Sequence, residues 1–202
     1  MIEVEQRLKV WREERHLTRQ IQNKHLLSNI LEELTEYSRA NTNYDKIDAL
    51  CDICVFCLNS VDYDEKAIFN ESYLAFRDIS TINVSLSILQ SLECFLGGDK
   101  EQISQIVFAC LKAVKEFTKK EPLECLKETI KEIESRTGKY VKEKGKFVKD
   151  IGAYSLKEAK DYIYKQYGDK GILLAEIDKS WLFSVEGKSI EIVKWYKADY
   201  GV

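Results

Sequence analysis

Apolar residues at helical spacing dominate the first two thirds of the chain. Between residues 18 and 40, the apolar face consists of Ile21, Leu26, Ile30, Leu34 and Tyr37. Intervals of three to five residues between these positions predict an amphipathic helix. The turn residues 41–43 follow, with Asn43 as the expected N-cap, and a second predicted helix covers residues 44–60.

The middle of the chain predicts two further helices. The third is expected to start at a cap formed by Asp78 or Ser80 and to end at the glycine pair 97–98. The fourth is expected to follow it and to reach Lys120. The preceding segment 61–78 has an irregular pattern, so we expect it to lie at the surface.

The last third of the chain combines helices with strands. Pro122 suits the first position of a fifth helix, which is expected to stop near Gly138. Ser155 and Glu158 form a capping-box pattern for a shorter helix that ends at Gly168. Alternating apolar residues then predict a small antiparallel hairpin or meander, with the strands GILLAEI (171–177), WLFSVEG (181–187) and SIEIVKWY (189–196).

These patterns predict a mainly α protein: an antiparallel helical bundle of four to five helices, with a small α+β insertion near the C-terminus. We expect a helical domain over residues 1–150. Residues 151–202 form an extension with a helix and strands, whose final YKADY segment returns to the site of the helical domain. Hydrophobic residues make up 45% of the chain and charged residues 32%, which is enough to build a sizeable core. The single proline favours long uninterrupted helices.

Charge and hydropathy narrow the class of protein further. The net charge of −3 creates no overall field that would recruit nucleic acid, so we expect no specific nucleic-acid partner. We find no apolar stretch long enough to span a bilayer and no N-terminal run that resembles a signal peptide. Six cysteines in a chain of this size do not make a disulfide scaffold. A reduced, cytoplasmic protein is therefore expected.

Three cysteines recur at every third position, as Cys51, Cys54 and Cys57. One interpretation is a metal or iron–sulfur site, but the ferredoxin pattern needs a fourth cysteine soon after, followed by proline. The surrounding sequence DALCDICVFCLNSV is typical of a helix interior. We therefore favour the interpretation that these cysteines are small buried hydrophobic residues.

Acidic residues gather on both sides of the turn at residues 41–43. Glu36 and Asp48 each lie five residues from this turn, while Glu33 and Asp52 lie eight and nine residues from it. In two antiparallel helices, equal offsets give equal heights, at about 1.5 Å per residue. Glu33 and Glu36 share one face of the first helix, and Asp48 and Asp52 share one face of the second. Two such pairs facing each other would form a cage of four carboxylates, whose oxygens suit Mg²⁺ or Mn²⁺.

A polar stripe extends these acidic positions along both predicted helices. Asn29 lies four residues before Glu33, and Gln22 lies seven before Asn29. Asn59 lies seven residues after Asp52. Because buried polar groups without partners are costly, the stripe makes sense as the wall of a polar pocket. The alternative is a solvated helix face, and the pattern alone is equally compatible with both.

The two acidic segments, NILEELTEYSRA and DKIDALCDICVF, resemble the all-α nucleoside triphosphate pyrophosphohydrolases, the MazG-like and dimeric dUTPase-like superfamily. The signature of this family is E-E-x-x-E, followed on the next helix by E-x-x-D. Glu32, Glu33 and Glu36 match its first half, and Asp52 matches its final Asp. The chain departs from the signature at Ala49, where this form of the motif places a Glu.

Some phage-type relatives have D-A-L-x-D instead, which the segment DALCD matches. Asp48 is therefore the expected fourth metal ligand, with Asp45 as the alternative. The segments 131–150 and WYKADY (195–200) are similar to the C-terminal region of phage-type members, where the two lie close together in sequence. In this chain, residues 154–194 separate them as an insertion.

The resemblance implies Mg²⁺-dependent hydrolysis of a nucleoside triphosphate to the monophosphate and pyrophosphate, by a homodimer or higher homo-oligomer. Bound Mg²⁺ or Mn²⁺ would neutralise phosphate charge and lower the pKa of a bound water. Glu32 or Glu36 would orient this water for attack on the α-phosphorus. The implied metal ligands are Glu33, Glu36, Asp48 and Asp52.

Cationic residues would have to bind the triphosphate, because an acidic wall repels it. The expected phosphate-binding residues are Arg136, Lys139, Lys144, Lys146, Lys149, Tyr196 and Lys197. Gln22, Asn29 and Asn59 are placed to read a base or sugar, but the sequence does not choose among dUTP, dCTP and non-canonical nucleotides. A different interpretation is a non-enzymatic helical module that binds nucleic acid or protein through residues 136–149.

Overall fold

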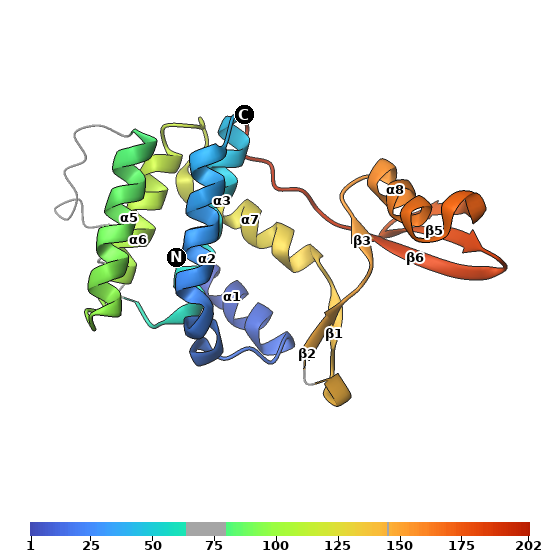
Figure 1. The fold of residues 1–202 in the computed structure, drawn as a ribbon, viewed down its shortest axis with the longest axis horizontal. Helices are drawn as coiled ribbons and strands as arrows, with labels where there is room; N and C mark the ends of the chain where they lie inside the picture. Colours follow the sequence, from blue (N-terminus) through green and yellow to red (C-terminus); the bar gives the residue numbers. More distant parts are fainter. Residues whose placement is uncertain (64–79, 145) are drawn as a thin grey trace. The chain divides into compact units, whose positions relative to one another are not determined.

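The chain divides into two compact units, whose elements are shown in Figure 1. Unit 1 consists of residues 1–130 and 199–202, and unit 2 consists of residues 131–198. Apart from the side chain of Lys144, the computed structural model describes residues 1–63, 80–144 and 146–202.

Unit 1 is helical, which confirms the mainly α class. Helices α2 and α3 pack side by side, α3 packs against α6, and α6 packs against α5 (Figure 1). Across the described residues, no helix combines the length and the apolar character that crossing a membrane requires. The helices are α1 (Ile2–Glu14), α2 (Arg19–Arg39), α3 (Asn43–Ser60), α5 (Thr81–Leu96), α6 (Gln102–Val114) and α7 (Pro122–Ser135), the last of which continues into unit 2.

Hydroxyl side chains cap the helices of unit 1. Ser80 Oγ accepts a backbone N–H from the first turn of α5 at 3.3 Å, which confirms one of the two expected caps; Asp78 lies outside the described residues. Thr42, and not Asn43, caps α3, because Thr42 Oγ1 accepts the N–H of Asp45 at 3.1 Å. Asn43 is the first helical residue, and its side chain donates to a backbone carbonyl of the α6–α7 connection instead.

Two helices end earlier than the sequence pattern predicts. Helix α6 ends at Val114 rather than at Lys120. The N–H groups of residues 116 and 117 donate to carbonyls three residues earlier, at 3.1 and 3.0 Å, which tightens the chain into a turn. Helix α7 ends at Ser135 rather than near Gly138, because a strand begins at Gly138.

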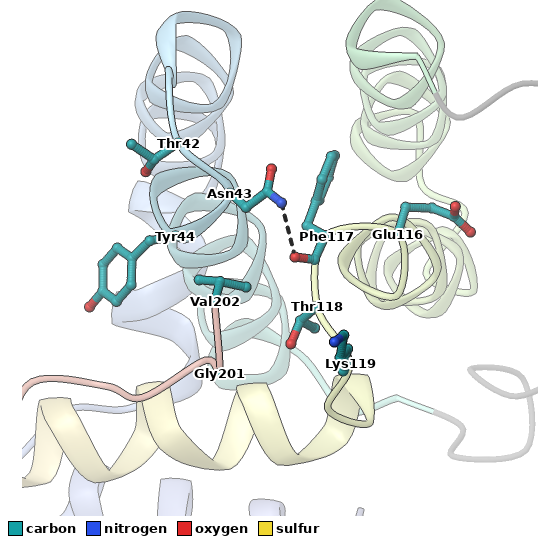
Figure 2. Close-up of a pocket in the computed structure, with 9 residues that line it drawn as sticks. All are labelled: Thr42, Asn43, Tyr44, Glu116, Phe117, Thr118, Lys119, Gly201 and Val202. Carbon is teal, nitrogen blue, oxygen red and sulfur yellow. Dashed lines mark hydrogen bonds between the residues drawn. The ribbon is translucent and has the colours of Figure 1, made fainter.

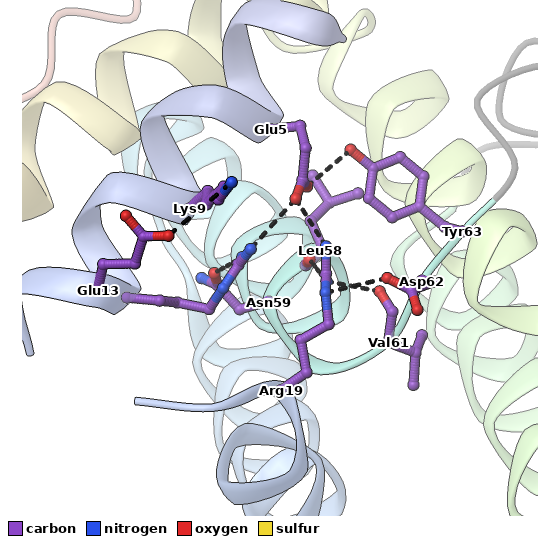
Figure 3. Close-up of polar contacts among 10 residues, drawn as sticks. Glu5, Lys9, Glu13, Arg19, Leu58, Asn59, Val61, Asp62 and Tyr63 are labelled. Atoms are coloured by element: carbon purple, nitrogen blue, oxygen red, sulfur yellow. Dashed lines mark hydrogen bonds and ion pairs between the residues drawn. The ribbon is translucent and has the colours of Figure 1, made fainter. Parts of the chain in front are cut away.

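Buried polar contacts hold α1 to α3 (Figure 3). Arg12 is 6% exposed and donates to Asn59 Oδ1 at 2.6 Å and to Glu5 Oε1 at 3.1 Å. Arg19 donates to the same Glu5 oxygen at 2.7 Å and to two backbone carbonyls at the end of α3. An arginine at a buried position interrupts the apolar periodicity, so the sequence pattern did not predict α1.

The cysteines of α3 lie inside the protein. Cys51, Cys54 and Cys57 are fully buried, and none of the six cysteines forms a disulfide. Burial raises the pKa of all three thiols well above its ordinary value, so they stay protonated. The interpretation that they are buried residues of a helix interior is confirmed.

After the end of α7, unit 2 forms a hairpin that the sequence pattern did not predict. Strands β1 (Gly138–Val141) and β2 (Lys146–Lys149) pair in antiparallel register, with Gly138 opposite Lys149. A Cβ atom on Gly138 would lie 2.4 Å from the carbonyl oxygen of Val148, so only glycine fits this close approach. Lysines within both strands give the segment the composition of a basic loop.

A four-stranded sheet completes unit 2, in the order β3-β6-β5-β4. The antiparallel meander β4–β5–β6 is confirmed, but β3 pairs with β6 in parallel, so the sheet is mixed. Helix α8 packs against it, with Ile163, Phe183 and Ile192 in the shared core. The expected cap at Ser155 and stop at Gly168 are confirmed for α8. The bounds are β3 (Gly152–Ala153), α8 (Leu156–Tyr167), β4 (Gly171–Ile177), β5 (Ser180–Val185) and β6 (Lys188–Lys194).

Candidate functional site

Helices α2 and α3 bring acidic side chains of the two predicted pairs together. Glu33 is partly buried, and its pKa is raised to about 8. Burial is the largest cause, followed by the negative charge of Asp52 and then by those of Glu36, Asp48 and Glu32. Charges from both helices therefore act on one carboxyl group. We call Glu32, Glu33, Glu36, Asp48 and Asp52 the acidic cluster.

The members of the acidic cluster differ in exposure. Asp48 and Asp52 are half-buried, like Glu33, whereas Glu32 and Glu36 are exposed. The exposed members, Glu32 and Glu36, are in contact with solvent. The cluster therefore combines half-buried carboxyl groups with exposed ones.

Tyr200 reaches the acidic cluster from the end of the chain. Its hydroxyl donates to Asp48 Oδ1 at 2.6 Å and lies 2.9 Å from Thr129 Oγ1. The Tyr200 ring lies 4.9 Å from the ring of Tyr44, which stands one turn before Asp48 on α3. Burial and the neighbouring Asp48 carboxylate raise the pKa of the Tyr200 phenol, so it stays protonated and remains a donor.

Sequence reasoning missed Tyr200 and Thr129 at this site. The YKADY segment drew attention to Tyr196 and Lys197, but Tyr200 is the residue of this segment that contacts Asp48. A separation of 152 residues between these partners leaves no periodic signal. The available signal was the Tyr at the end of YKADY, whose phenol is a suitable donor to a carboxylate.

The acidic cluster has the chemistry of a site for a hard divalent cation. Its five members offer only carboxylate oxygens, which are the ligands that Mg²⁺ and Mn²⁺ prefer. Burial is the largest cause of the raised pKa of Glu33, and the repulsion from the neighbouring carboxylates that adds to it would be offset by a cation. Within the residues that the structure describes, no three Asp, Glu, His or Cys side chains already converge as a ready-made metal-binding group. Asp45, the alternative ligand, instead accepts from the Thr42 hydroxyl at 2.6 Å.

The raised pKa of Glu33 makes the stability of the metal-free protein depend on pH. The folded protein holds this proton up to about pH 8, whereas the unfolded chain releases it near the ordinary value of 4.5. Because the folded state binds the Glu33 proton more tightly, this proton stabilises the folded state. The stabilisation is complete below about pH 4.5 and is lost progressively as the pH rises through about 8. Glu33→Gln removes the titration and keeps the shape of the side chain.

We expect Glu33→Gln to melt at least about 3 °C higher than the wild type at pH 8.5 in EDTA. The expected difference in melting temperature is smaller than the pKa alone would give, because Glu33 is partly exposed to solvent. The difference should shrink as the pH falls towards 5. Scanning calorimetry across this pH range measures it, with Glu93→Gln on α5 as the matched exposed control. An unchanged difference between pH 5 and pH 8.5 would contradict the assigned pKa.

The polar stripe is only partly associated with the acidic cluster. Gln22 and Asn29 are half-buried on α2, as a pocket wall requires. Asn59 is 1% exposed, and its side-chain oxygen accepts from Arg12 at 2.6 Å. It lies seven residues beyond Asp52, or about 10 Å along α3. The side chain of Asn59 therefore contacts Arg12 in the buried network between α1 and α3.

The predicted phosphate-binding residues all lie in unit 2. Arg136 Nη2 donates to Glu132 Oε1 at 2.6 Å and also to the Tyr154 hydroxyl. Tyr154 in turn donates to the same Glu132 oxygen at 2.7 Å, and the other Glu132 oxygen accepts the N–H of Ala198 at 2.9 Å. Arg136 thus belongs to a network that ties the end of α7 to the chain leaving the sheet.

The remaining cationic candidates are more exposed. Lys139, Lys146 and Lys149 are exposed on the β1–β2 hairpin, and Lys197 is exposed near the end of unit 2. The side chain of Lys144 lies outside the described residues. Lys131 Nζ lies 3.8 Å from the centre of the Tyr196 ring, and the Tyr196 N–H donates to Ser135 Oγ at 2.9 Å. Phosphate binding by these residues stays a prediction.

A surface pocket is lined by Tyr44 at the start of α3 and by the last residues of the chain (Figure 2). It has a volume of about 680 Å³, and the side chain of Asn43 donates to the carbonyl of Phe117 at its wall, at 3.2 Å. Its lining residues do not include any member of the acidic cluster. They are Thr42, Asn43, Tyr44, Glu116, Phe117, Thr118, Lys119, Gly201 and Val202.

Comparison with other proteins places no further constraint on the site. Neither protein-family models nor characterised proteins nor solved structures match this chain.

Proposed function

We propose that this protein hydrolyses a nucleoside triphosphate to the monophosphate and pyrophosphate in a Mg²⁺-dependent reaction. The observation that carries the proposal is the acidic cluster, in which burial and then the charges of carboxylates from two neighbouring helices raise the pKa of Glu33 to about 8. The resemblance of the segments around Glu32–Glu36 and Asp48–Asp52 to the all-α pyrophosphohydrolases supports the same reaction.

The residues of the acidic cluster divide into two roles under this proposal. Bound Mg²⁺ or Mn²⁺ would supply positive charge that offsets both carboxylate and phosphate charge. The residues that would hold it are Glu33, Glu36, Asp48 and Asp52. Glu32 or Glu36, which are exposed, would accept a proton from a water molecule and orient it towards the α-phosphorus.

The triphosphate needs cationic partners, and the lysines of the β1–β2 hairpin supply candidates. Lys139, Lys146 and Lys149 act as point charges, while Arg136 is already paired with Glu132. Gln22 and Asn29 are the candidates for contacts with the base or sugar, since Asn59 is occupied by Arg12. The substrate class includes dUTP, dCTP and non-canonical nucleotides.

Pyrophosphate release from a panel of canonical, uracil-containing and modified deoxynucleoside triphosphates tests the proposal directly. We expect at least one nucleotide to yield monophosphate and pyrophosphate in equal amounts with Mg²⁺, and only background release in EDTA. Asp52→Asn serves as the control for contaminating enzymes, because it removes a carboxylate that acts on Glu33. Release of inorganic phosphate instead of pyrophosphate, or no turnover of any nucleotide, would reject the reaction.

A second candidate function rests on the exposed lysines of the β1–β2 hairpin. A module that binds RNA or a protein through residues 136–149 would not need the acidic cluster. Its affinity for a polynucleotide would fall steeply with salt and would be the same for the wild type and Asp48→Asn. Fluorescence anisotropy with a labelled oligonucleotide, repeated at several salt concentrations, separates this function from hydrolysis.

Cellular location and assembly complete the proposal. All six cysteines are free thiols, which fits a reducing cytoplasm. The family resemblance implies a homodimer or a higher homo-oligomer, and light scattering coupled to size-exclusion chromatography measures this state.

A further inference from the structure

Residues 199–202, which belong to unit 1, form a strap that is fixed to the rest of this unit at several points. Thr118 Oγ1 donates to the Tyr200 carbonyl at 2.6 Å, and Lys120 forms an ion pair with Asp199 at 3.1 Å. The N–H of Asp199 donates to Glu128 at 3.1 Å. These contacts come from the α6–α7 connection and from α7, so the strap is held independently of its contact with the acidic cluster.

The donors and acceptors around Tyr200 give its hydroxyl a fixed direction. A phenol carries one proton, and Tyr200 donates it to Asp48 Oδ1 at 2.6 Å. The Tyr200 oxygen also lies 2.9 Å from Thr129 Oγ1, whose hydroxyl donates to the carbonyl of Cys125 at 3.2 Å. Tyr200 is 1% exposed, so water does not compete for its bond to Asp48.

The ring of Tyr200 is also held in place. It packs at 4.9 Å and 44° against Tyr44, which belongs to the same helix as Asp48. With its backbone fastened by Thr118 and its ring against Tyr44, Tyr200 presents its hydroxyl at a defined position. The bond from Tyr200 engages Oδ1 of Asp48 and so restrains the orientation of the Asp48 carboxyl group.

We propose that Tyr200 is a positioning residue that orients the Asp48 carboxylate for metal binding, and that the strap is therefore part of the metal site. This inference rests on the proposed function. Its physical basis is general: groups that hydrogen-bond a metal ligand fix its orientation, and their removal weakens metal binding by roughly 10- to 100-fold.

Mn²⁺ titration, followed by electron paramagnetic resonance of the free ion, tests the inference without any substrate. We expect Tyr200→Phe, which keeps the ring, to raise the Kd for Mn²⁺ about tenfold. Circular dichroism confirms that the variant is folded. Tyr164→Phe, which removes an exposed hydroxyl from α8, is the matched control and should leave the Kd within about twofold of the wild type.

A double-mutant cycle with Asp48→Asn shows whether Tyr200 acts through Asp48. In the Asp48→Asn background, Tyr200→Phe should change the Kd by less than about twofold, because the carboxylate that Tyr200 orients is gone. Equal effects in both backgrounds would overturn the inference, as would a wild-type Kd in Tyr200→Phe, and both results leave the proposed function standing. A wild type that takes up no Mn²⁺ would overturn the metal site and the inference together.

Discussion

Replacing Glu5 by Ala is expected to lower the free energy of unfolding by about 3 kcal/mol. Glu5 Oε1 accepts from both Arg12, at 3.1 Å, and Arg19, at 2.7 Å. The side chain of Arg12 is 8% exposed, so without Glu5 its charge stays buried with Asn59 as the remaining partner seen here. This loss in the free energy of unfolding lies at the lower end of the range for breaking a buried ion pair, because the Glu5 side chain is 30% exposed.

Urea unfolding at neutral pH measures this loss. Helix α1 offers its own control: Glu13 pairs with Lys9 at 3.9 Å, and the side chains are 65% and 66% exposed. Glu13→Ala should therefore change stability by less than about 0.5 kcal/mol. Equal losses in Glu5→Ala and Glu13→Ala would show that the buried network does not fasten α1 to α3.

The same network explains which helices the sequence could predict. Helices α2, α3 and α5 were predicted because their buried positions are filled mainly by apolar residues at helical spacing. The buried positions of α1 include Arg12, whose burial depends on Glu5 and Asn59. Only the folded structure brings these partners together. The sequence of α1, taken by itself, therefore shows a polar residue at a buried position and no clear apolar face.

The strands also fall into those that the sequence could predict and those that it could not. The meander β4–β5–β6 alternates apolar and polar residues and joins its strands by short turns, which are local signals. Strand β3 covers only Gly152–Ala153 and pairs in parallel with β6, about 40 residues later, so it has neither length nor a neighbouring partner to mark it. In β1–β2, lysines occupy several strand positions and hide the alternation.

The acidic cluster could be predicted because its geometry is local. A short turn joins α2 to α3, so equal distances from the turn bring carboxylates to similar heights. Tyr200 could not be predicted in this way. Residues 131–198 form a separate unit between Thr129 and Tyr200, yet these two side chains meet beside Asp48 at 2.9 Å. The division at residue 130 falls inside α7, where the helical pattern is unbroken.

Replacing Glu36 by Gln is expected to lower kcat at least about a hundredfold for the nucleotide that the protein turns over. Glu36 is the member of the acidic cluster that belongs both to the proposed metal ligands and to the residues proposed to orient water. Gln keeps the size of the side chain but carries no charge and cannot accept a proton. Because one substitution removes both contributions, the loss should exceed that of Glu32→Gln, which removes a single one.

Steady-state kinetics with saturating Mg²⁺ measures both variants, with Glu93→Gln on α5 as a control that should retain wild-type kcat. Removing Glu36 also removes a negative charge that raises the pKa of Glu33, so the melting temperature should not fall at high pH. A large loss of kcat without a loss of stability can only come from the reaction itself. Near-wild-type kcat in Glu36→Gln would exclude Glu36 from the mechanism, and Glu32 would then be the residue that orients the water.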